Sequence, residues 1–84
     1  MNSTYPRGLR RAAPTVDAVT EYDRAHFYHY IRLLDAHSAG MTSDEMCRNI
    51  LDIDPTTDPD GAHKTLQSHL DRAVWMSNVG FRQA

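Results

Sequence analysis

The chain has 84 residues, of which 40% are apolar, and its 9 Lys and Arg against 11 Asp and Glu give a formal net charge of −2. A chain of this length buries only about 60% of the surface that it exposes when unfolded, so it builds one modest core, and a two-domain enzyme is excluded. An ordinary small-molecule pocket would hollow out most of that core, and the slightly acidic balance argues against a dedicated DNA-binding domain, which usually carries a basic excess. A binding protein is therefore the expected class.

The N-terminal region differs in composition from the rest of the chain. Its first 16 residues contain two prolines, one glycine and the bases Arg7, Arg10 and Arg11, but no acidic residue. We predict a flexible basic arm over residues 1–20, followed by one folded domain over residues 21–84. Basic arms often bind partners, but three arginines near a terminus also occur in tails without such a role.

The first strong helical periodicity spans residues 22–38. Apolar side chains recur there at the i, i+3, i+4 and i+7 spacing of one helix face. The residues predicted to form this face are Phe27, Tyr30, Ile31, Leu34 and either His37 or Ser38. Gly40 is expected to end the helix, because it lacks a Cβ atom and adopts the left-handed conformation that commonly closes helices.

Two further helices are predicted. The second begins at a capping box of Thr42 and Glu45 and ends near residue 51, and the third begins with Asp58 as N-cap and ends at Gly80. Their predicted buried residues are Met46, Cys47, Ile50 and Leu51 in the second helix, and Ala62, Leu66, Leu70, Ala73, Val74 and Ser77 in the third. No strand pattern is present. A long, a short and a long helix predict an all-α, tri-helical helix-turn-helix-like domain.

No enzymatic or metal-binding motif is recognised in the sequence. His26 and His29 are spaced so that both rings could face one ion, but a structural zinc site needs four ligands. Cys47 lies in an apolar row, which favours a small buried residue over a reactive thiol. We predict no catalytic residue, no cofactor and no metal. The single cysteine, the lack of a secretory signal and the lack of a long apolar run predict a cytoplasmic protein.

The predicted helix-turn-helix carries an unusual charge. Between residues 42 and 61, six acidic residues accompany one basic residue, Arg48, a net charge of −5. In a DNA-reading helix-turn-helix this region meets phosphates, and like charges brought together cost on the order of 1 kcal/mol per pair near a surface. Some of these acids also cap helices. The segment is therefore predicted to bind protein rather than DNA.

Exposed residues of the third helix and two aromatic residues complete the predicted contact surface. His63, Lys64 and Gln67 suit base edges as well as a protein partner. Two interpretations stay open for the aromatic residues: packing between the first and third helices, or an exposed contact patch. The predicted partner-binding residues are Asp44, Asp52, Asp54, Asp58, Asp60, His63, Lys64, Gln67, Asp71, Tyr28 and Trp75.

Two stretches of the sequence resemble the helix-turn-helix-like domain of regulators on proteobacterial integrative and conjugative elements. They are HFYHYIRLLDAHSAGMTSDEMCRNIL and HKTLQSHLDRAVWMSNVGFRQA, and the matching features are the R-L-L-D-A motif before Gly40, the short capped helix, and the L-D-R-A motif before Gly80. The resemblance covers about residues 22–84. Members are either fused to transcriptional activators or stand alone as small QseM-like antiactivators.

A chain of this length resembles the second type. The resemblance implies binding to two protein partners, a LuxR-type (TraR-like) quorum-sensing activator and an excision (FseA-like) activator, so that excision and conjugative transfer of the element are repressed. The alternative hypothesis is a DNA-binding repressor or excisionase that uses the basic arm with His63, Lys64 and Gln67. The acidic segment departs from the pattern of a DNA-binding member and agrees with the antiactivator interpretation.

Overall fold

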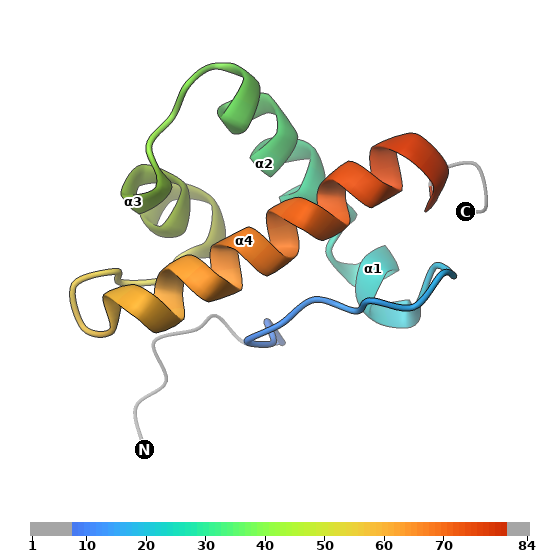
Figure 1. Cartoon of the computed structure of the whole chain (residues 1–84), viewed down its shortest axis with the longest axis horizontal. Helices are drawn as coiled ribbons and strands as arrows, with labels where there is room; N and C mark the ends of the chain where they lie inside the picture. Colours follow the sequence, from blue (N-terminus) through green and yellow to red (C-terminus); the bar gives the residue numbers. More distant parts are fainter. Residues whose placement is uncertain (1–7, 81–84) are drawn as a thin grey trace.

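The computed structural model describes residues 8–80, which contain helices and no strand. The helices are α1 (Glu21–Ala25), α2 (Phe27–Ser38), α3 (Ser43–Met46), η1 (Cys47–Leu51), α4 (Pro59–Trp75) and η2 (Met76–Gly80). The single turns η1 and η2 are π-helical and continue α3 and α4. In Figure 1, α4 runs along the molecule with α2 and α3 on one side and the N-terminal segment on the other. The predicted all-α, helix-turn-helix-like class is confirmed.

The predicted first helix is divided into α1 and α2. The chain leaves helical geometry at His26, where φ is −118° and ψ is 16°. A capping box that the sequence analysis missed starts α1: the Thr20 hydroxyl accepts the Asp23 N–H, and the Asp23 carboxylate accepts the Thr20 N–H at 2.9 Å. The break lets α1 turn its own buried face toward α4.

The buried face of α2 differs from the predicted one. Tyr30, Leu33 and Ala36 are buried, whereas Ile31 is 49% exposed. His37 and Ser38 are exposed as well, while Phe27 and Leu34 are half-buried against a small cluster of Tyr30, Ala73 and Met76. Apolar residues cover more than one row of this helix, so their period alone does not determine which row meets α4.

The local signals around α3 and the start of α4 are confirmed. Gly40 takes a φ of +82° directly after α2, and Thr42 and Glu45 form the predicted capping box. Asp58 caps α4, with a proline at the first helical position. All four residues predicted to be buried in the second helix are buried there: Met46, Cys47, Ile50 and Leu51.

The buried face of α4 is wider than predicted. Ala62, Leu66, Leu70 and Ala73 are buried as expected, but Val74 and Ser77 are exposed. The residues buried instead or in addition are Thr65, His69, Arg72 and Met76. The wider face results from a second covering element, because α1 and the N-terminal segment lie against the side that the periodicity assigned to solvent.

Residues 8–20, which we call the N-terminal strap, provide much of that cover. The strap contains no helix, but Leu9 and Ala13 are buried, and the Ala13 N–H donates to the Ser68 hydroxyl at 2.8 Å. The predicted arm covers residues 1–20, but from residue 8 on the chain is part of the packed structure. Arg7, the rest of residues 1–7 and the tail over 81–84 lie outside the described residues.

Replacing Leu33 by alanine tests the position of the α2 face. Leu33 is fully buried in the main core, so L33A should lower the free energy of unfolding by about 2–5 kcal/mol. The matched variant I31A, on the half-exposed row, should cost less than about 1 kcal/mol. Urea denaturation measures both, and equal losses would contradict the observed face.

Candidate functional site

Five of the six predicted acidic contact residues lie together at one end of the molecule, and Asp71 lies farther along α4. We call Asp44, Asp52, Asp54, Asp58 and Asp60 the acidic edge, and all five are exposed. Asp44 is on α3, and the others belong to the loop that joins η1 to α4 and to the first turn of α4. His63 Nε2 on α4 lies 2.7 Å from Asp44 Oδ1 and links the two helices across this edge.

Hydrogen bonds of their own fix some of these carboxylates. Asp54 accepts the N–H and the hydroxyl of Thr56 at 2.9 and 2.6 Å, and these bonds lower its pKa. Asp58 accepts the Gly61 N–H at 3.2 Å as the N-cap of α4. Asp52 and Asp60 have no side-chain hydrogen bond to any residue of the described range. At this edge the carboxylates of Asp54 and Asp58 are therefore held in place, whereas those of Asp52 and Asp60 carry no such restraint.

Arg48, the one basic residue of the acidic segment over residues 42–61, also lies at the acidic edge. Arg48 lines the same open groove as Asp52, Ile53 and Asp54. One guanidinium offsets only part of the charge of this edge, so the end of the molecule stays acidic.

The other predicted site residues fall into two further groups. Along α4, Lys64 is exposed, and Gln67 Nε2 donates to Asp71 Oδ1 at 2.7 Å, one helical turn from Trp75. Tyr28 is 69% exposed at the start of α2, beside the Arg32 guanidinium, whose carbon lies 5.4 Å from the ring centroid. The start of α2, the helix that holds Tyr28, lies near α1, whereas the start of α4 lies near α3 (Figure 1), so these two helix starts are apart.

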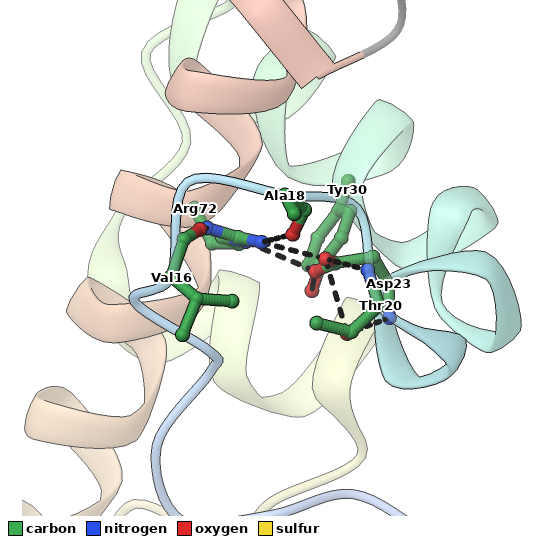
Figure 2. Close-up of polar contacts among 6 residues, drawn as sticks. All are labelled: Val16, Ala18, Thr20, Asp23, Tyr30 and Arg72. Atoms are coloured by element: carbon green, nitrogen blue, oxygen red, sulfur yellow. Dashed lines mark hydrogen bonds and ion pairs between the residues drawn. The ribbon is translucent and has the colours of Figure 1, made fainter. Parts of the chain in front are cut away.

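The structure contains a buried ion pair that the sequence analysis did not identify. Arg72 on α4 and Asp23 on α1 are 4% and 0% exposed, and two hydrogen bonds of 3.0 and 2.7 Å join them. Arg72 also donates to the carbonyls of Val16 and Ala18, and the Tyr30 hydroxyl donates to Asp23 at 2.8 Å (Figure 2). The pair thus ties the strap, α1, α2 and α4 together.

The charge state of this pair follows from its contacts. Burial by itself raises the pKa of Asp23, but the hydrogen bonds from Arg72 and its other partners outweigh burial and lower the pKa to about 2. Burial and the neighbouring carboxylate raise the pKa of Tyr30, so its hydroxyl keeps its proton and donates. Asp23 is therefore ionised over the whole physiological pH range, and its negative charge compensates the positive charge of Arg72.

A second buried polar chain holds the beginning of the strap. The Arg10 N–H donates to the Tyr22 hydroxyl at 3.0 Å, and that hydroxyl lies 2.6 Å from His69 Nε2. His69 Nδ1 lies 2.7 Å from the Thr65 carbonyl, which can only accept, so Nδ1 carries the proton and Nε2 accepts from Tyr22. The bond that Nε2 accepts from Tyr22 needs a neutral His69, and burial lowers the pKa of this ring more than the bond to the Thr65 carbonyl raises it.

His26 and His29 form a similar pair beside this chain. His26 Nε2 lies 3.3 Å from the Gly8 carbonyl, so it donates there and leaves Nδ1 to accept from His29 Nδ1 at 3.0 Å. Burial lowers the pKa of both rings. Within residues 8–80, no group of three His, Cys, Asp or Glu side chains is arranged to hold a metal ion. Cys47 is fully buried, which raises the pKa of its thiol.

Comparison of the chain with known protein families and with curated protein sequences gives no match. The functional interpretation therefore depends on the chemistry of the described residues. Among these, residues 42–61 carry six of the 11 acidic residues of the chain. Within residues 8–80, none of the helices combines the length and the apolar character needed to cross a membrane.

Acidification should destabilise the fold through the buried histidines. The pKa of His69 and of His26 is lower in the folded chain than the ordinary value of 6.5, so the unfolded chain binds more protons once the pH falls below 6.5. The free energy of unfolding should therefore decrease between pH 7 and 5. Urea denaturation at stepped pH measures this decrease.

The variant H69Q should reduce that pH dependence, with the part due to His26 remaining, whereas H37Q, at an exposed histidine, should keep all of it. A free energy of unfolding that is equal at pH 7 and pH 5 would contradict a neutral buried His69. The range stops at pH 5 because Asp23 loses its stabilising charge only at lower pH, as the pH falls from about 4 through its folded pKa of about 2.

Removing one partner of the buried ion pair should be costly. The variant D23N keeps the size of the side chain but leaves the Arg72 guanidinium buried without a counter-ion, which typically costs about 3–5 kcal/mol of unfolding free energy. The control D71N alters an exposed carboxylate next to Arg72 and should stay within about 0.5 kcal/mol. Equal denaturation midpoints for the two variants would contradict the stabilising role of the pair.

Proposed function

We propose that this protein is an antiactivator, which binds a transcriptional activator and prevents it from acting at its DNA site. The observation that carries the proposal is the acidic edge on a helix-turn-helix-like unit. In a DNA-reading protein of this type, α3 with η1 would cross the phosphate backbone and the start of α4 would enter the major groove. Carboxylates occupy that surface here.

Electrostatics favours a basic protein partner for this edge. Exposed carboxylates repel phosphates but attract the lysines and arginines with which a DNA-binding protein contacts its duplex. Such attraction also raises the rate of association and weakens with salt. An activator whose DNA-binding surface is covered in this way cannot bind its promoter.

The residues that the DNA-binding alternative needs are largely engaged within the protein. His63 is held by Asp44, Gln67 donates to Asp71, and the Arg10 guanidinium lies over the Tyr22 ring at 4.8 Å. Lys64 has no ion pair within the described range. Binding of DNA through His63 or Gln67 would first have to break these contacts.

The sequence resemblance supports a narrower form of the proposal. The partners are then a LuxR-type quorum-sensing activator and an excision activator, and the effect is repression of excision and conjugative transfer of an integrative and conjugative element. Both interactions would take place in the cytoplasm, where such regulators act.

Neutralising the acidic edge tests the proposal. The triple variant D52N/D54N/D58N should weaken binding to a purified LuxR-type or excision activator at least about tenfold, because it removes three charges that attract the partner. Asparagine also caps helices well, so the start of α4 is retained. Biolayer interferometry measures the dissociation constants at two salt concentrations.

The matched control removes three exposed acids elsewhere, as D17N/E21Q/D35N. It changes the net charge by the same amount and should leave binding within about twofold. Equal weakening by both variants would show that only net charge matters and would overturn the assignment to the edge. A gel shift of promoter DNA by the protein alone, steeply reduced by salt, would overturn the proposal in favour of a DNA-binding repressor or excisionase.

A further inference from the structure

A small hollow lies between the strap and the second half of α4. Its lining residues are Pro14, Thr15, Ser68, Asp71, Arg72 and Trp75. Its volume is about 190 Å³, whereas pockets for drug-sized ligands hold roughly 300–1,000 Å³. The hollow therefore has room for one inserted side chain rather than for a metabolite.

One wall of the hollow is fixed by the strap. The hydrogen bond from the Ala13 N–H to Ser68 holds the strap against α4, and the bond from Arg72 to the Val16 carbonyl holds it on the other side of Pro14 and Thr15. The two wall residues between these anchors are thereby placed before any partner arrives. A preformed wall reduces the ordering cost of binding.

Among the side chains that line the hollow, the charge without a counter-charge is negative. Asp71 is exposed, and its Oδ1 accepts from Gln67, while its Oδ2 has no hydrogen bond within the described range. Arg72 contributes no free charge, because Asp23 neutralises it and the strap carbonyls occupy its remaining contacts. The uncompensated group at this site is the Asp71 carboxylate.

An aromatic ring stands beside that carboxylate. Trp75 is half-buried, and the Arg72 guanidinium carbon lies 3.9 Å from its ring centroid. The indole thus already contacts one guanidinium, and Trp75 is also one of the residues that line the hollow. A carboxylate next to an indole recognises a planar cation by charge-assisted hydrogen bonds and by stacking.

We infer that this hollow receives an arginine side chain of the partner protein, whose guanidinium donates to Asp71 and stacks on Trp75. The inference rests on the proposed function in that the arginine comes from the DNA-binding surface of the activator. Arginine is favoured over lysine because its planar fork matches a carboxylate and stacks on a ring, whereas an ammonium group is a compact, strongly hydrated charge.

The test uses Trp75, the one tryptophan of the chain, as the reporter. Acetyl-arginine amide, titrated into the full chain, should change the Trp75 fluorescence saturably. Acetyl-citrulline amide has the same shape without the charge and should cause no saturable change. The variant D71N should raise the dissociation constant for the arginine probe at least about fivefold, and the control D35N, at an exposed carboxylate on α2, should leave it unchanged.

Three results would overturn the inference: no saturable response to the arginine probe, an equal response to citrulline, or equal affinities of D71N and D35N. An equal affinity for acetyl-lysine amide would overturn the preference for arginine. The test is independent of the proposed function. If the probe binds as expected while no activator is captured, the proposed function fails and the arginine site stands. If an activator is captured while the probe does not bind, the arginine site fails and the proposed function stands.

Discussion

The buried ion pair of Asp23 and Arg72 is the constraint on which the rest of the structure depends. A charge without solvent is tolerated only when a counter-charge and hydrogen bonds compensate it. Asp23 supplies the counter-charge, and the carbonyls of Val16 and Ala18 take further donors of the guanidinium (Figure 2). The strap can leave α4 only by exposing these donors to water or leaving them unpaired, which makes the strap an integral part of the fold.

The same pair explains why the first helical segment is divided. Asp23 caps α1 through Thr20 and also accepts from Arg72 and Tyr30, which lie on α4 and α2. One carboxylate meets these partners together because α1 turns at His26 instead of continuing the axis of α2. The break therefore serves an interaction between distant segments, and the aromatic periodicity of residues 22–38 continues across it without a sign of the turn.

How much the sequence predicted depends on whether a feature is local. The Thr42 capping box, the Asp58 N-cap and the left-handed Gly40 are short hydrogen-bonding or backbone patterns, so they were predicted with their residues. The capping box of Thr20 and Asp23 could have been predicted in the same way, because a threonine is followed three residues later by an acidic residue. The row of α2 that is buried depends on where α4 and the strap lie, which no local pattern determines.

The two parts of the candidate site, the acidic edge and the hollow, differ in the same respect. The acidic edge was predicted because its residues are close in sequence, whereas the hollow needs the strap and α4 together. The edge and the hollow nevertheless share one helix: Asp60 and Asp71 are 11 residues apart, which is about three turns and ~16 Å along an α-helix, on nearly the same side. In the proposed complex one basic surface of the partner would meet both, with the charged edge attracting the partner and the hollow fixing its register.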